Sequence, residues 1–176
     1  MYTNTTGDSN SAFGYQALYL NTTGVRNTGI GIYSLYNNTT ADRNTGVGAY
    51  SLYTNTTGIR NAGVGNQALY YNTTGDYNTA VGYAALGNST TSDGNTGLGY
   101  AALGANTTGA YNVGIGYQAL DANTTGNTST AIGYNCLSAN TAGDNTAVGA
   151  ECFELNTSAT GQTGLGYKAG ENCTTA

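Results

Sequence analysis

The sequence repeats one 17-residue phrase along its whole length. Asn10 and Asn27 begin two successive units, and the same start recurs every 17 residues as far as Ser129. One residue is missing before the unit that begins at Asn145, and the spacing returns to 17 at Gln162, so that ten units follow a partial one. Repetition at a fixed, short period restricts the chain to architectures in which one structural unit stacks on the next.

Each position of the repeat accepts a narrow choice of residues. The consensus is N-T-[AG]-[VIL]-G-Y-x-A-L-x-x-N-T-T-G-x-x, whose positions we number 1 to 17. Position 4 is large and apolar in all ten units, position 9 is Leu or Phe in nine, and we expect both columns to face inward. The position 4 column is Phe13, Ile30, Val47, Val64, Val81, Leu98, Ile115, Ile132, Val148 and Leu165, and the position 9 column is Leu18, Leu35, Leu52, Leu69, Leu86, Leu103, Leu120, Leu137 and Phe153.

Glycine marks two corners in each unit. It fills position 5 from Gly14 to Gly166 and recurs at position 15, for example at Gly24 and Gly58. A short unit with two such bends predicts one coil of a parallel β-solenoid, with coils about 4.8 Å apart. Helical repeats need about 33 residues and two long helices per unit. Residues 1–176 are therefore predicted to form one all-β domain of about ten coils.

Two columns of asparagine are predicted to stack into ladders that support a thin core. A coil that buries about two large side chains gains roughly 1.5–3 kcal/mol from each, less than the cost of ordering its backbone. Hydrogen bonds between coils, and association with other chains, are expected to supply the rest. The first ladder contains Asn10, Asn27, Asn44, Asn61, Asn78, Asn95 and Asn112, and the second contains Asn21, Asn38, Asn55 and Asn72.

Small residues lie directly beside both expected core columns. Position 3 is only Ala or Gly, and position 8 is Ala, Ser or Cys in every unit. Neighbouring residues on a strand face opposite ways, so we expect these small residues to face outward and to let another chain approach closely. The alternative is that Ala and Gly merely suit tight corners.

The segments "NTAVGYAAL", "NTGLGYAAL" and "NTAVGAECF" resemble the repeats in the YadA-like heads of trimeric autotransporter adhesins, and similar repeats occur in phage tail fibres. The resemblance covers essentially the whole chain. It implies left-handed parallel β-rolls that associate as trimers, lie on the cell surface or the virion, and bind host matrix or other cells. The chain differs in its longer unit, its many tyrosines, and the lack of a recognisable neck, stalk or anchor segment.

No capping segment is recognisable in the chain, which starts within a unit at Met1 and stops in the turn "ENCTTA". Uncapped ends expose strand edges, so we expect end-to-end docking into an open filament as an alternative to a trimer. The chain can equally be a segment of a longer fibre protein.

Composition argues against catalysis. The chain has no histidine, only 7% charged residues and a net charge of −5, so we assign no catalytic residue, metal or cofactor. With four basic residues it lacks the positive patch that nucleic acid needs, and no stretch approaches the roughly 20 apolar residues of a membrane span. Asp42, Asp76, Asp93 and Asp144 share position 16, where a calcium column is the alternative to solvated turn carboxylates.

Cys136 and Cys152 both occupy position 8 of successive units. Stacking at about 4.8 Å falls within the roughly 4.4–6.8 Å Cα range of a disulfide, although parallel side chains are poorly aimed for one. The alternative is that both cysteines replace Ala as small buried residues.

The N-T-T-G segment has two explanations. It contains the acceptor triplet for N-glycosylation, and it also suits a turn in which Asn bonds the local backbone and Gly takes positive φ. We favour the turn and keep glycosylation as an addition. The candidate acceptors are Asn4, Asn21, Asn38, Asn55, Asn72, Asn106 and Asn123.

Tyrosines form two further columns, which suit contacts with sugars, with host proteins or with other subunits, as well as plain packing between coils. Adjacent threonines such as Thr22 and Thr23 face opposite sides and do not form the flat hydroxyl array of an ice-binding solenoid. The sequence thus favours an extracellular structural or adhesive fibre, not an enzyme, with ice binding as a further alternative. The columns are Tyr19, Tyr36, Tyr53 and Tyr70, and Tyr83, Tyr100, Tyr117 and Tyr134.

Overall fold

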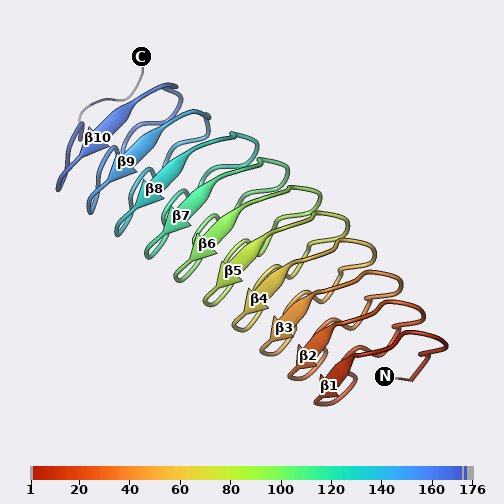
Figure 1. Ribbon diagram of the computed structural model, residues 1–176. Helices are drawn as coiled ribbons and strands as arrows, with labels where there is room; N and C mark the ends of the chain where they lie inside the picture. The colour runs from red at the N-terminus through yellow and green to blue at the C-terminus, as the bar shows by residue number, and fades with distance from the viewer. Residues whose placement is uncertain (1, 172, 174–176) are drawn as a thin grey trace.

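The computed structural model describes residues 2–171 and 173, and over these residues the chain is a β-solenoid without a helix. Ten short strands pair in parallel in one sheet, in chain order. Each coil contributes one strand, and the coils stack into a rod with β1 at one end and β10 at the other (Figure 1). The strands are β1 Ser11–Phe13, β2 Thr28–Ile30, β3 Thr45–Val47, β4 Ala62–Val64, β5 Thr79–Val81, β6 Thr96–Leu98, β7 Val113–Ile115, β8 Thr130–Ile132, β9 Thr146–Val148 and β10 Thr163–Leu165.

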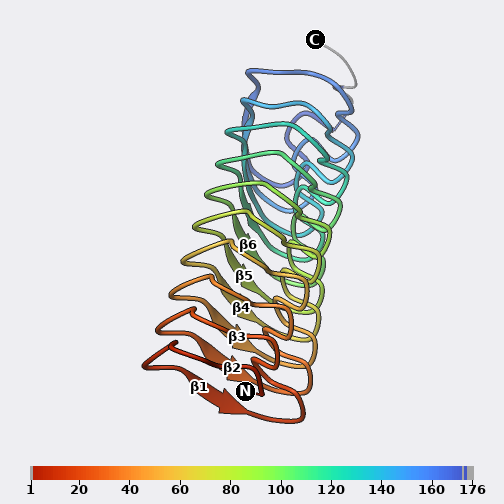
Figure 2. The ribbon, with the colours of Figure 1, turned by 90° about the vertical axis from the view of Figure 1, so that its right-hand side faces the viewer.

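Each strand residue pairs with its own equivalent in the next coil, so the strands lie one above the next along the rod (Figure 2). The shorter unit keeps this register, because Thr130 pairs with Thr146 although they are only 16 residues apart. Its missing residue is therefore absorbed in the segment that returns from one strand to the next. The predictions about the outermost residues, Met1 and 174–176, lie outside the described residues.

The core contains one large apolar side chain in each of the first nine coils. The leucines of position 9 have no exposed surface from Leu18 to Leu137, and Phe153 is 6% exposed, as the sequence predicts. The prediction that position 4 faces inward is wrong. Its side chains face outward, and Phe13 and Ile30 are 78% and 40% exposed. Positions 3 and 8, predicted to face outward, are buried, for example at Ala80 and Ala85.

The narrow interior explains this inversion. Position 3 is the middle residue of a three-residue strand, so positions 2 and 4 both point away from it. The leucine of the preceding coil already fills the space above position 3, because a Cβ added at Gly29 would lie 3.3 Å from Leu18 Cγ. Only Gly or Ala fits beside that leucine, so the larger position 4 residue is placed on the outer face.

Position 8 supports the strand from the opposite wall. Ser34 Oγ donates to the carbonyl oxygen of Gly46 at 2.9 Å, and Ser51 Oγ donates to that of Gly63 at 2.8 Å. At this position Ala only packs in the interior, whereas Ser also forms a hydrogen bond between the two walls of adjacent coils.

Both predicted asparagine ladders are present and buried. In the position 1 ladder, Asn27 Oδ1 accepts from the backbone N–H of Asn44 at 2.9 Å, and Asn27 Nδ2 donates to the Ala41 carbonyl at 2.7 Å. In the position 12 ladder, Asn38 Nδ2 donates to Asn21 Oδ1 and to the Ala41 carbonyl, each at 3.0 Å. Each asparagine thus satisfies backbone groups that the turns leave unpaired.

The two glycine columns serve different needs. At position 5, φ is positive, with values such as 135° at Gly99, and an added Cβ would overlap the carbonyl oxygen of Gly116. At position 15, φ is not positive, contrary to the prediction for N-T-T-G. A Cβ at Gly58 would overlap the carbonyl oxygen of Gly75, so crowding between coils favours glycine there, although Ala41 and Ser92 hold the same position in two other coils.

Position 9 also lies in the left-handed region, with φ of 51° at Leu86 and 55° at Leu103. Branching at Cβ makes this conformation costly for Val and Ile. The same constraint does not apply to the strand at position 4, where Val and Ile are common. This difference in φ explains why the large residues at position 9 are only Leu and Phe, whereas position 4 also accepts Val and Ile.

Gly99→Ala is expected to lower the free energy of unfolding by about 3 kcal/mol or more, because positive φ and the overlap with Gly116 add to one another. Gly87→Ala is the control, since φ is not positive there and the nearest atom to an added Cβ is the Ala84 carbonyl oxygen at 3.0 Å. Thermal unfolding followed by circular dichroism measures both. Equal midpoints for the two variants would contradict this account of position 5.

Candidate functional site

The outer face of the sheet carries a continuous apolar stripe. We define this stripe as the ten position 4 residues from Phe13 in β1 to Leu165 in β10. Val64, Leu98 and Ile132 are 39%, 43% and 37% exposed, and the members between them are half-buried against their neighbours. A stripe that runs the whole length of the described rod exceeds the scattered apolar exposure that is usual on a monomer.

Threonine flanks the stripe on the same face. Position 2 is occupied mostly by Thr, for example Thr28, Thr45 and Thr79, each two residues before its stripe partner. No strand residue at position 2 or position 4 of the described coils is charged. The face therefore combines methyl groups with hydroxyls and can approach another surface without burying a charge.

The sequence contains a signal for this surface. Side chains alternate along a strand, so positions 3 and 4 must point to opposite faces of the sheet. The face that is buried is the one on which the leucine of position 9 lies. Because position 3 never exceeds Ala in size, it alone can lie beside that leucine.

The predicted Tyr19–Tyr70 column is a stack of rings. Tyr19 and Tyr36 have ring centroids 5.3 Å apart, and Tyr36 and Tyr53 lie 5.5 Å apart, with interplanar angles of 2° and 20°. Tyr70 follows Tyr53 at 5.3 Å. The second column, from Tyr83 to Tyr134, has spacings of 5.0 to 5.4 Å. Ring faces inside a column are covered by the next ring, which is the packing between coils that the sequence predicts. The rings of the second column are still 44% to 50% exposed.

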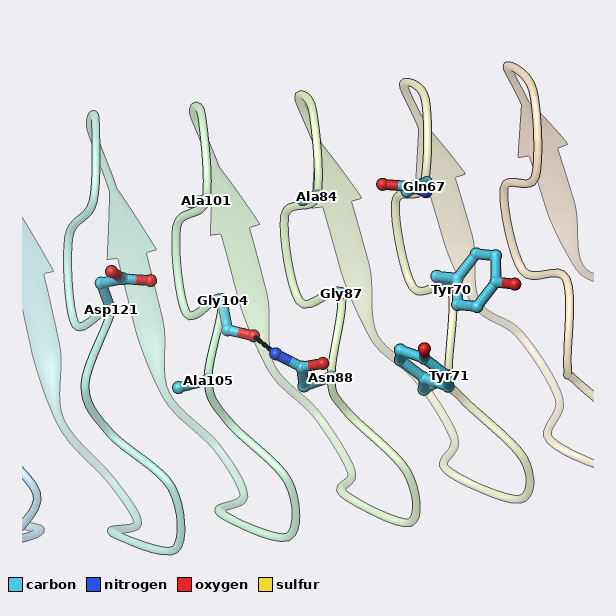
Figure 3. Close-up of a pocket in the computed structure, with 10 residues that line it drawn as sticks. All are labelled: Gln67, Tyr70, Tyr71, Ala84, Gly87, Asn88, Ala101, Gly104, Ala105 and Asp121. Carbon is cyan, nitrogen blue, oxygen red and sulfur yellow. Dashed lines mark hydrogen bonds between the residues drawn. The ribbon is translucent and has the colours of Figure 1, made fainter.

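A notch interrupts the first tyrosine column beyond Tyr70. In position 10, Gly87 and Gly104 replace tyrosine, and Asp121 follows them, which opens a groove of about 390 Å³. Figure 3 shows its lining, with Tyr70 and Tyr71 at one end and Asp121 at the other. We define the notch by its lining residues Gln67, Tyr70, Tyr71, Ala84, Gly87, Asn88, Ala101, Gly104, Ala105 and Asp121. Of the two predicted tyrosine columns, only Tyr70 lines it.

The candidate glycosylation sites are mostly core residues. Asn21, Asn38, Asn55, Asn72, Asn106 and Asn123 have no exposed surface, and Asn4 alone among the candidates is exposed. The amide of Asn55, for instance, donates to Asn38 Oδ1 at 3.0 Å and to the Gly58 carbonyl at 2.9 Å. A glycan on such a nitrogen would require the ladder to open, so the structure supports the part of the turn explanation in which Asn bonds the local backbone, but not the positive φ at the glycine.

Cys136 and Cys152 are buried free thiols in the structure, without the disulfide that their spacing permits. Cys136 Sγ lies 3.4 Å from the carbonyl oxygen of Ala147. Burial, together with the neighbouring Cys152, raises the pKa of the Cys136 thiol to about 12. The two side chains thus act as small core residues in the place of Ala.

Three of the four position 16 carboxylates, those of Asp42, Asp76 and Asp93, accept backbone N–H groups of the preceding coil, whereas the carboxylate of Asp144 accepts from the Thr128 hydroxyl. Asp42 Oδ1 accepts from the N–H of Val25 at 2.8 Å, and Asp76 Oδ1 accepts from that of Ile59 at 2.7 Å. The repeat pattern gives no signal for this contact between coils. Over residues 2–171 and 173, no group of three His, Cys, Asp or Glu side chains is placed to hold a metal ion.

Comparisons with protein-family models, with curated proteins and with solved structures found no match for this chain. The resemblance to YadA-like head repeats therefore stays a prediction. In the described part of the chain, no helix has the length and apolar character needed to cross a membrane.

Iodoacetamide at pH 8 is expected to leave Cys136 and Cys152 unmodified in the folded rod, because both side chains are buried and burial raises the pKa of both thiols. Both should react once the chain is unfolded in guanidinium, as peptide mass spectrometry can measure. Rapid labelling without denaturant, or a peptide pair linked by a disulfide under non-reducing conditions, would contradict this prediction.

Proposed function

We propose that this chain is a structural subunit of an extracellular fibre, which associates with copies of itself along the apolar stripe. The observation that carries the proposal is the uncharged outer face of the sheet, with a large apolar side chain in each of ten consecutive coils. Such a surface gains free energy when it leaves water, at about 25 cal/mol per Å² of apolar area.

A second copy is the partner that fits this face best. The stripe repeats at the coil spacing of about 4.8 Å, and only another solenoid of the same period matches every member in register. A globular partner would cover a few coils and leave the others exposed. Three stripes that meet around one axis would also close the assembly, in agreement with the trimers that the resemblance to adhesin heads implies.

Such an assembly would form a long rod that presents a similar binding surface in every coil. A stack in which each coil contacts only its neighbours sets length by the number of coils and offers an even surface along the rod. Weak contacts repeated along several subunits give avidity without a deep pocket. We therefore place the protein outside the cell, or on a virion, as a shaft or adhesive head.

Ice binding is a second candidate, favoured by one observation on the same face. The threonine column and the stripe form two parallel rows on strands in straight register, for example Thr96 beside Leu98. This is a different set of threonines from Thr22 and Thr23. Ice binding needs the face free, whereas assembly buries it, so the oligomeric state separates the two functions.

The double variant Val81→Asp, Ile115→Asp is expected to convert the assembly into 17.8 kDa monomers in light scattering, because it places two carboxylates in the buried centre of the contact. The matched control is Thr74→Asp, Thr108→Asp, which adds the same charge at the same spacing on exposed turn residues. Circular dichroism should be unchanged in both.

A wild-type chain that is a 17.8 kDa monomer at tens of micromolar would overturn the fibre proposal. An assay of ice recrystallisation would then decide the second candidate. Long filaments of wild-type chain that persist in the double variant would show that association uses the ends of the rod instead of the stripe.

A further inference from the structure

The notch lies where the residues at two positions of the repeat change. Position 10 is tyrosine in four consecutive coils up to Tyr70, then glycine at Gly87 and Gly104, then Asp121. Position 7 also becomes small in those two coils, at Ala84 and Ala101. Two successive coils thus lose their outward side chains together, and the result is a groove with distinct ends.

The backbone does not require the two glycines. Neither has positive φ, in contrast to the position 5 column, and four other coils hold tyrosine at the same position. At Gly87 the three nearest atoms to an added Cβ all belong to Ala84. The absence of a side chain at Gly87 therefore serves the open space above it.

One end of the notch is aromatic. The rings of Tyr70 and Tyr71 lie 4.6 Å apart at an angle of 78°, and Tyr71 is 51% exposed. Such a corner offers a rigid apolar surface beside two phenol hydroxyls.

The other end and the floor are polar. Asp121 is half-buried, and the amide of Gln118 contacts its carboxylate at 3.4 Å. Asn88 Nδ2 donates to the Gly104 carbonyl at 2.7 Å, which fixes this amide on the floor (Figure 3). Burial raises the pKa of the Asp121 carboxyl. A partly desolvated acceptor gains more from a hydroxyl donor than one in open water.

We propose that the notch binds a neutral saccharide of about two sugar rings. The C–H face of a pyranose would pack on the Tyr70–Tyr71 corner, and its hydroxyls would donate to Asp121 and bond the amide of Asn88. Three coil steps, about 14 Å at the coil spacing, separate the backbone of Tyr70 from that of Asp121. The Asp121 carboxylate extends back over Gly104, where an added Cβ would lie 2.6 Å from Asp121 Oδ1, so the space between the tyrosine corner and this carboxylate spans about two coils and suits a short saccharide. The volume of the groove also falls in the usual range for small ligands.

The charges of the lining exclude anionic ligands. No Arg or Lys lines the notch, and Asp121 would repel a phosphate or sulfate group. The site is also independent of the proposed assembly, because no residue of the apolar stripe belongs to its lining. Failure of one proposal therefore leaves the other intact.

The test is a titration of the folded chain with cellobiose, lactose, maltose and N,N′-diacetylchitobiose, followed by saturation-transfer NMR. Saturable binding of at least one disaccharide is expected. Tyr71→Ala should weaken this binding at least about tenfold, and Asp121→Asn about fivefold. The decisive variant is Gly87→Tyr, which extends the tyrosine column into the notch and should abolish binding while the fold is retained.

The matched control is Glu154→Tyr, which adds the same ring to position 10 two coils beyond Asp121 and should bind as the wild type does. Absence of saturable binding for all four disaccharides would overturn the proposal, as would unchanged binding in Gly87→Tyr. Binding of trilysine alone, with loss in Asp121→Asn, would instead assign the notch to a cationic peptide. The oligomeric state of Gly87→Tyr, measured in parallel, separates an effect on the notch from an effect on assembly.

Discussion

Direct stacking of each coil on its equivalent is the constraint from which the other features of this rod follow. Backbone groups bond from coil to coil, as where the N–H of Leu86 meets the Ala102 carbonyl at 3.0 Å, and the asparagine ladders satisfy the turns. The interior between the two walls is so narrow that one leucine fills it. Hydrogen bonds thus contribute a larger share of the cohesion than in an ordinary globular core, and glycine is preferred where two coils touch through their backbones.

At some surface positions the fold restricts the type of residue, and at others it does not. The outward stripe is enforced, because position 4 alternates with a position that must be small, and every coil therefore contributes one apolar side chain to the same face. Positions 7, 10 and 11 are free, since they accept residues as different as Tyr, Ala, Asn and acidic residues without a change of backbone. Assembly can rely on the enforced positions, and recognition of a particular ligand can only arise at the free ones.

Much of the fold could be predicted from the sequence, because a fixed period with recurrent glycine leaves few architectures. The solenoid, the leucine column and both asparagine ladders followed from that pattern. The orientation of positions 3, 4 and 8 did not, since alternation separates two faces without saying which one is inside. Resolving it required the volume of the interior, which Leu18 and its equivalents occupy. The notch also escaped prediction, because the change from Tyr70 to Gly87 looks like ordinary variation until the coils are placed side by side.

The strict register has a consequence for how such a protein can change over time. Because each residue pairs with its equivalent, a gene that gains or loses one whole unit yields a rod longer or shorter by one step, with every ladder continuous across the junction. The shorter unit between β8 and β9 shows that even a deletion within a unit is absorbed outside the strand. Copy number can therefore adjust how far a feature such as the notch stands from either end of the rod, while the feature itself stays unaltered.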